Sequence, residues 1–156
     1  MDKTFYLDAV KAKGLADAVD LQARAPELTG TALYAEAEKI PGFQAAKALK
    51  NMQERPAGQT DGFVCRSTAG RVVRLIQTYD SETYPQEPEE LPAQWRFVWS
   101  TDPKDALPFV ALSTSPYAKG DCCLDAAGQP KRSKVDNNVW PPDTSPEYWE
   151  DVDPEA

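Results

Sequence analysis

Two stretches of the chain repeat the same order of residues. The first, from Gly62 to Val98, reads GFVCRSTAGRVVRLIQTYDSETYPQEPEELPAQWRFV, and the second, from Gly120 to Val152, reads GDCCLDAAGQPKRSKVDNNVWPPDTSPEYWEDV. Each opens with Gly-x-x-Cys, has Ala-Gly eight positions after the first glycine, an arginine four positions further on, and a proline-rich run that closes on a tryptophan. We interpret them as two copies of one structural unit, marked by Gly62, Gly70 and Trp95 in the first copy and by Gly120, Gly128 and Trp149 in the second.

Each copy predicts a β-hairpin followed by a short third strand. In the first copy, residues 63–66 and 72–76 are β-type runs on either side of a turn in which Gly70 takes positive φ. The second copy repeats this pattern, but Pro130 in its return strand cannot donate a ladder hydrogen bond, which indicates an edge strand. Proline-rich stretches then lead to short strands that begin at Trp95 and Trp149, and we expect both indoles to close a small core.

The first sixty residues have a different pattern of apolar residues, which predicts helices. Apolar spacing indicates one helix around residues 15–22, Thr31 is a candidate N-cap for residues 32–39, and an apolar stripe indicates a helix over 43–53. The fold class is therefore α+β: a helical N-terminal segment followed by two small three-stranded antiparallel β modules in tandem. The expected boundaries are a helical attachment or oligomerisation segment at 1–60, a first module at 61–100, a linker at 101–116 and a second module at 117–153.

Composition excludes several classes of function. The net charge of −8 argues against nucleic acids and anionic membrane surfaces, since both require a basic face. No apolar run approaches membrane-spanning length, and the charged N-terminus is unlike a signal peptide, so we expect synthesis and folding in a cytoplasm. The three cysteines, Cys65, Cys122 and Cys123, are expected to be reduced thiols. Without histidine or a Cys-x-x-Cys pair, neither a metal site nor a cofactor is predicted.

The second copy carries a motif that resembles a known family. Its residues run Tyr117-Ala118-Lys119-Gly120-Asp121, then Gly128, then Pro141-Pro142, then Trp149. This order resembles the carbohydrate-binding modules of families 5 and 12, which are small three-stranded domains. The step Asn138-Val139-Trp140-Pro141-Pro142, and Arg74-Leu75-Ile76-Gln77 with Ser81 in the first copy, are similar to the variant in bacteriophage tail and tail-fibre-associated proteins. The resemblance implies a virion protein made in the host cytoplasm, with Tyr117 and Asp121 in structural roles.

The resemblance also implies a glycan-binding surface, but the usual stacking rings are missing. Sugar-binding members place aromatic residues on the return strand, where this chain has Pro-Lys-Arg-Ser-Lys-Val (130–135) and Val-Val-Arg-Leu-Ile (72–76). The candidate binding residues are therefore the remaining aromatic, amide and carboxylate groups: Trp140, Tyr148, Asn138 and Asp136 in the second copy, and Trp99 and Tyr84 in the first. Each has an alternative: the rings pack over the small cores, and residues 136–138 form an Asx-type turn.

No arrangement of residues predicts catalysis. Nucleophilic triads need a histidine that the chain lacks, and Glu82, Glu87, Glu89 and Glu90 lie in a proline-rich stretch that does not fix a pair of carboxylates. We therefore predict a non-enzymatic virion protein of a tail, a fibre or a head decoration. Its expected partners are other virion proteins and a surface or cell-wall glycan, and its helical segment is expected to form a homo-oligomer, with a trimer favoured. The alternative is a purely structural assembly adaptor that binds no sugar.

Overall fold

The structure, a computed structural model, describes residues 17, 20–48 and 63–154. Part of the predicted first helix, the end of the predicted helix 43–53 and the marker Gly62 lie outside these ranges. The described N-terminal part is helical but built from short pieces. Residues 20–24 are α-helical and precede η1 (Ala25–Glu27), α2 (Gly30–Ala35), η2 (Ala37–Lys39) and α3 (Phe43–Ala48).

The N-cap of α2 is Thr29, which corrects the prediction of Thr31. The Thr29 side chain accepts a hydrogen bond from the Ala32 amide, which satisfies one of the free donors of the first helical turn. Thr31 lies inside the helix, and its hydroxyl oxygen is 2.9 Å from that of Thr101. The helix is therefore joined from its first turn to the segment that follows the first sheet.

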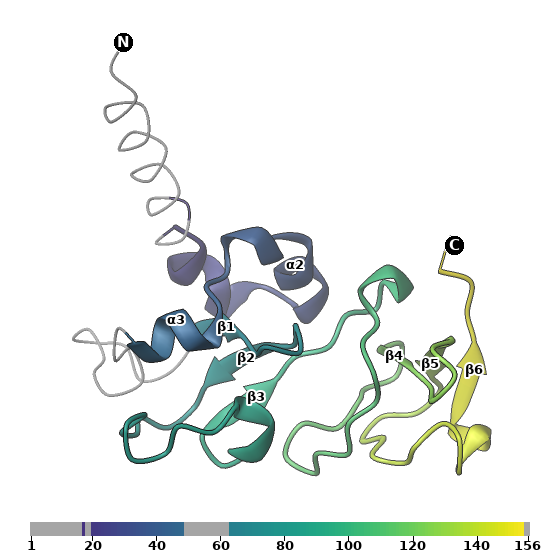
Figure 1. Cartoon of the computed structure of the whole chain (residues 1–156). Helices are drawn as coiled ribbons and strands as arrows, with labels where there is room; N and C mark the ends of the chain where they lie inside the picture. The colour runs from purple at the N-terminus through teal and green to yellow at the C-terminus, as the bar shows by residue number, and fades with distance from the viewer. Residues whose placement is uncertain (1–16, 18–19, 49–62, 155–156) are drawn as a thin grey trace.

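Two three-stranded antiparallel sheets follow the helices (Figure 1). The first has the order β1 (Val64–Arg66), β2 (Val72–Leu75), β3 (Trp95–Phe97), and the second has the order β4 (Cys122–Leu124), β5 (Pro130–Ser133), β6 (Trp149–Asp151). The short turns η3 (Pro88–Glu90) and η5 (Pro146–Tyr148) precede the third strands, and η4 (Pro103–Asp105) lies between the sheets. The predicted α+β fold with two small β modules is confirmed.

The two sheets have the same register, residue for residue. Cys65 pairs with Val73 in the first hairpin as Cys123 pairs with Lys131 in the second. Leu75 pairs with Trp95, and Ser133 pairs with Trp149. The hairpin turns also match, since Gly70 and Gly128 both have positive φ, at 92° and 81°. The internal repeat read from the sequence is therefore a repeat of backbone structure.

The repeat begins further upstream than the sequence indicated. The amide of Arg66, at the end of β1, donates to the Pro41 carbonyl, and the amide of Leu124, at the end of β4, donates to the Leu107 carbonyl. Both contacts belong to isolated parallel bridges, Gly42 with Arg66 and Pro108 with Leu124. Each bridge follows a short helical turn, η2 or η4. The first module thus includes residues near 41, and the segment 101–116, predicted as a linker, contributes the bridge of the second module.

A phenylalanine just after each bridge packs on the closing tryptophan of its sheet. Phe43 meets Trp95 edge-to-face, with ring centroids 6.1 Å apart and an interplanar angle of 83°. Phe109 meets Trp149 in the same way, at 6.0 Å and 88°. Perpendicular ring pairs of this kind add to the stabilisation that comes from burying aromatic area. The two indoles, which are 0% and 5% exposed, thus occupy equivalent surroundings.

Pro130 lies in a central strand, which corrects the prediction of an edge. It is the first residue of β5, between β4 and β6. The pairing of β5 with β6 runs only from Lys131–Asp151 to Ser133–Trp149, so Pro130 stands beyond the last pair. The missing N–H therefore removes no donor from the ladder, which is why proline is tolerated at this position.

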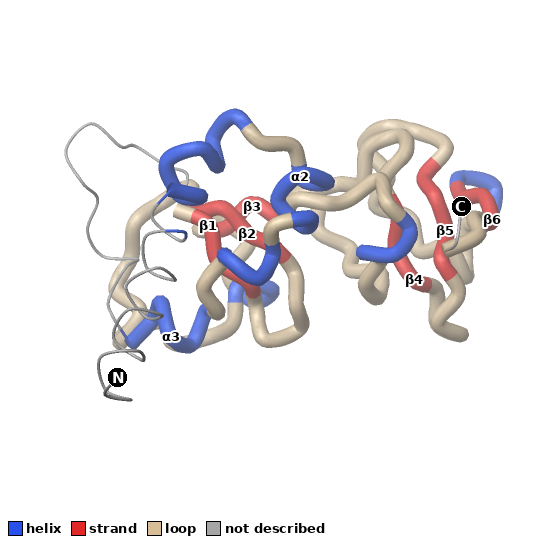
Figure 2. Tube along the Cα trace, turned by 90° about the horizontal axis from the view of Figure 1, so that it is seen from above, coloured by secondary structure: helices blue, strands red, loops and turns tan. Residues whose placement is uncertain are grey.

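The two modules share one hydrophobic core. Trp99, which follows β3, stacks on Tyr117 of the second module with ring centroids 4.2 Å apart and an interplanar angle of 14°. Phe97 and Phe109 extend this stack on either side, at 5.9 Å from Trp99 and 5.4 Å from Tyr117. The helical segment 20–40 packs on the other face of the first sheet, against Val64 and Val72, whereas α3 contributes Phe43 and Ala46 to the shared core. Figure 2 shows the N-terminal helices gathered around the first sheet, with the second sheet at the far end of the molecule.

The outer edges of the two joined modules differ from the edge at which the modules meet. At the junction, the amide of Cys122 donates to the carbonyl of Ser100 from the first module. The equivalent amide of Val64 donates instead to the side chain of Gln22, so the helical segment occupies that edge. Where the first module has Phe97 and Trp99, the second has two exposed aspartates, Asp151 and Asp153. The second module therefore has exposed acidic side chains at the positions where the first has buried aromatic rings.

The shared core predicts one unfolding transition for the whole described chain. We expect Trp149→Ala to lower the free energy of unfolding by about 3–5 kcal/mol, because it leaves a cavity beside Phe109 and Tyr117. Trp140→Ala is the matched control, since this indole is 41% exposed and its loss should cost about 1 kcal/mol or less. Urea unfolding followed by far-UV and near-UV circular dichroism tests this. Two separate transitions in the parent protein would contradict a shared core.

A pair of glycine substitutions tests the contact between α2 and the junction. A Cβ on Gly30 would lie 2.0 Å from the carbonyl oxygen of Trp99, so the backbone would have to move. We expect Gly30→Ala to destabilise the protein by about 1–3 kcal/mol. Gly42→Ala is the control, because a Cβ there meets nothing within 4 Å, and its effect should stay within about 0.5 kcal/mol. Equal urea midpoints for the two variants would contradict the packing described here.

Candidate glycan-binding surface and the module junction

Two stacked rings, one of them exposed, stand on the segment between β5 and β6. Trp140 and Tyr148 have ring centroids 4.5 Å apart and an interplanar angle of 27°. Tyr148 is half-buried, whereas 41% of Trp140 is exposed. The structure thus brings together two of the residues predicted to contact a sugar. The alternative, in which Trp140 folds over the hairpin core, does not describe its position.

The backbone beneath this pair is tied to the core of the second module. The indole Nε1 of Trp149 donates to the carbonyl of Trp140 at 2.8 Å. The amide of Trp140 donates to Oδ1 of Asn138 at 3.1 Å. Both backbone groups of Trp140 are therefore held by side chains of buried residues, so the exposed indole is positioned before any ligand arrives.

Asn138 supports the loop and has no exposed surface for a ligand. It is 0% exposed, and its Nδ2 donates to Oγ of Ser133 at 2.9 Å and to the carbonyl of Tyr148 at 3.3 Å. Its backbone forms an antiparallel bridge with Tyr117. The structure places Asn138 beneath the loop surface, with all of these polar groups engaged inside the protein.

Asp136 is exposed and accepts a hydrogen bond from the neighbouring loop. Its Oδ1 accepts a hydrogen bond from the amide of Lys119 at 3.0 Å. The next residue, Asn137, has φ of 55°, in the left-handed region that asparagine tolerates better than most residues. Asp136 therefore shapes the surface beside the motif residue Gly120, whose φ is 98°.

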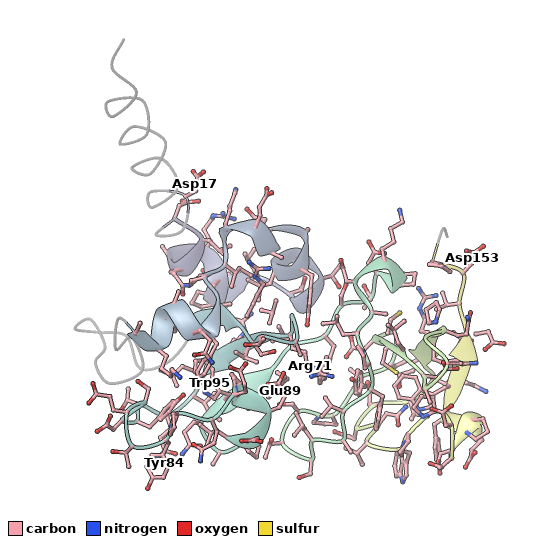
Figure 3. All side chains as sticks on the ribbon, viewed as in Figure 1. Asp17, Arg71, Tyr84, Glu89, Trp95 and Asp153 are labelled. Atoms are coloured by element: carbon pink, nitrogen blue, oxygen red, sulfur yellow. The ribbon has the colours of Figure 1, made fainter. Side chains whose placement is uncertain are left out.

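The two first-module candidates separate into a core residue and a surface residue. Trp99 is only 9% exposed, and its Nε1 donates to the carbonyl of Ser115 at 3.0 Å, so it joins the modules and is not a ligand residue. Tyr84 is 52% exposed on the loop between β2 and β3 (Figure 3). The sequence did not separate these two roles, because the burial of Trp99 depends on its contact with Tyr117 of the other module.

The remaining motif residues of the second module lie in its core and its turns. Tyr117 is 1% exposed, and burial raises the pKa of its phenol above the usual range. Oδ2 of Asp121 accepts from the amide of Ala118 at 2.8 Å, while burial raises the pKa of this carboxyl group. Gly120 and Gly128 supply the positive φ angles of the two turns.

An ion pair at the junction was not singled out from the sequence. Nη1 of Arg71 lies 3.1 Å from Oε1 of Glu89, and Nη2 donates to the carbonyl of Pro108 in the second module at 2.7 Å (Figure 3). Glu89 also accepts from Oγ of Ser67 at 2.6 Å. Both charged side chains are largely buried, so each compensates the desolvation of the other. This group connects the modules, and Glu89 is occupied by these contacts.

The cysteines pack as apolar side chains. All three are buried and free. Burial raises the pKa of the Cys123 thiol to about 12, and it also raises the pKa values of Cys65 and Cys122. At neutral pH the groups are therefore thiols, and the adjacent Cys122 and Cys123 point to opposite faces of β4, as neighbours in a strand do.

No family model, curated protein or solved structure matches the chain. Within residues 17, 20–48 and 63–154, no three histidine, cysteine or acidic side chains are grouped in a way that would hold a metal ion. Across the same part of the chain, no helix is both long and apolar enough to span a bilayer. The proposal of a binding site therefore depends on the geometry of the loops.

The supporting role of Asn138 predicts a stability effect. We expect Asn138→Ala to destabilise the protein by about 1–3 kcal/mol, since Ser133 and the Trp140 amide lose a buried partner. The exposed residue Lys134 provides the control, with Lys134→Ala expected within about 0.5 kcal/mol. Thermal and urea unfolding measure both variants. An unchanged midpoint for Asn138→Ala would show that the network adds no stability.

Proposed function

We propose that the protein is a non-enzymatic bacteriophage virion component, of a tail, a fibre or a decoration, that binds a host-surface glycan through its second module. The observation that carries the proposal is the exposed face of Trp140, stacked on Tyr148 and anchored by Trp149. Tryptophan and tyrosine are enriched at contact sites, because each combines a large apolar ring with a polar group. The virion assignment rests on the motif resemblance from Tyr117 to Trp149, with the Asn138–Pro142 step, and on Arg74–Gln77 with Ser81 in the first copy.

Trp140 offers a flat apolar surface, which suits the C–H face of a pyranose ring. Tyr148 covers one side of the indole, so a sugar would stack on the remaining exposed part. The hydroxyl group of Tyr148 and the carboxylate of Asp136 are the polar groups proposed to bind sugar hydroxyls. A site of this size gives weak affinity, and several copies on a particle would multiply it. We expect the N-terminal segment to supply those copies by trimerisation and to attach to other virion proteins.

A second candidate function is a purely structural adaptor. The loss of stacking rings from β5, where Lys131 and Arg132 stand, favours this function. So does the burial of Trp99, which uses an aromatic residue to join modules rather than to bind a ligand. In this case Trp140 would contact a neighbouring virion subunit.

Tryptophan fluorescence separates the two functions. We expect titration with N-acetylglucosamine tetramer to shift the emission of the parent protein, and Trp140→Ala to weaken binding at least tenfold because the stacking surface is removed. Trp140→Phe should retain part of the affinity, since it keeps an aromatic face. An unchanged spectrum at high-millimolar tetramer, repeated with soluble cell-wall fragments, would favour the adaptor.

A further inference from the structure

The first module has its own exposed ring in the position that Trp140 occupies in the second. Each loop between the second and third strands carries an exposed aromatic residue followed by proline: Tyr84-Pro85 and Trp140-Pro141. Tyr84 stands 14 residues after Gly70, and Trp140 stands 12 after Gly128. Trp95 then comes 11 residues after Tyr84, and Trp149 comes 9 after Trp140. The second loop is thus shorter by two residues on each side of the same dipeptide.

Both loops are attached to their sheets by the core indole. The Nε1 group of Trp95 donates to the hydroxyl of Tyr79 at 3.1 Å, and that of Trp149 donates to the carbonyl of Trp140 at 2.8 Å. In each module the buried tryptophan therefore uses its polar atom to hold the loop that presents the exposed ring. The partner atoms differ, but the connection between core and loop is the same.

Tyr84 is held by a local turn. Its amide donates to the carbonyl of Asp80 at 2.9 Å. The carboxylate of Asp80 accepts from the amide of Glu82 at 2.8 Å and from the hydroxyl of Thr83 at 3.1 Å. These hydrogen bonds fix the backbone at Tyr84. The ring itself is 52% exposed, so the side chain adds little to the core.

The two loops lie on the same side of the molecule. Figure 1 shows the loop from β2 to β3 and the loop from β5 to β6 along the lower side of the two sheets, and Figure 3 shows Tyr84 at the tip of the former. The Trp99–Tyr117 stack and the bond from Arg71 to Pro108 join the modules between them. The two exposed rings are therefore held in a constant relation, as two contacts on one extended ligand require.

We propose that Tyr84 and Trp140 form a bivalent surface that binds one extended polysaccharide chain at two points. This inference rests on the proposed function of Trp140 and adds a second contact, in the first module. The surroundings of Tyr84 select the class of polymer: Asp80 and Glu82 are exposed beside it, and the chain has a net charge of −8. Polymers with phosphate or carboxylate groups are repelled, so the ligand is an uncharged polysaccharide.

The test compares a short with a long ligand on the full chain. N-acetylglucosamine tetramer reports single contacts by calorimetry, and soluble glycol chitin, an uncharged polymer of the same sugar, reports bivalent binding by affinity electrophoresis. We expect the parent protein to bind the polymer at least tenfold more tightly per sugar unit than the tetramer. Tyr84→Ala should remove this gain while the tetramer still binds at Trp140, and Tyr84→Phe should keep it.

Controls separate this inference from the proposed function. Ile76→Ser removes another exposed apolar side chain, 39% exposed just after β2, and should leave polymer binding unchanged. Polymer affinity that survives Tyr84→Ala but is lost in Trp140→Ala would overturn bivalence and leave the proposed function in place. Absence of binding to tetramer and polymer alike would overturn both. Tighter binding to polygalacturonate than to glycol chitin would contradict the assignment of an uncharged ligand.

Discussion

Each module depends on a perpendicular contact between a phenylalanine and a tryptophan. A sheet of three strands, each three or four residues long, buries too little surface to stand alone. The Trp95–Phe43 and Trp149–Phe109 pairs supply a large apolar centre and fasten the preceding segment to the sheet. The same indoles hold the neighbouring loops through their Nε1 groups. Strands, upstream bridge and loop therefore form around one side chain in each module.

Joining the modules enlarges a core that neither could supply by itself. The column from Phe97 through Trp99 and Tyr117 to Phe109 runs from one sheet to the other, and Arg71 adds a buried polar bond beside it. Gln22 occupies the outer edge of the first sheet, and exposed aspartates lie at and after the end of the last strand of the second. Small repeat units commonly gain stability from their neighbours in this way.

The proposed binding surface lies on two loops that are built in the same way in both modules but have different sequences. Both loops hold an aromatic–proline dipeptide outside the sheet, although one ring is a tyrosine and the other a tryptophan. Because the core indole positions each loop, the exposed ring is ordered without contributing to the core. A preorganised binding surface requires that buried residues, here the core indoles, hold the exposed rings that contact the ligand. This requirement also accounts for the burial of Asn138, which serves the loop and not the ligand.

By itself, the sequence determined the features that depend on local chemistry. Gly70 and Gly128 mark the hairpins because the turns need positive φ, and the repeated order of glycine, arginine and tryptophan predicts two equivalent sheets. Only the tertiary structure decided which rings are buried: Trp99 is covered because it stacks on Tyr117 across the junction, whereas Tyr84 is 52% exposed on its loop. The upstream Phe43 and Phe109 and the Arg71–Glu89 pair escaped prediction for the same reason. Their roles come from contacts between residues distant in the chain, for which local sequence carries no signal.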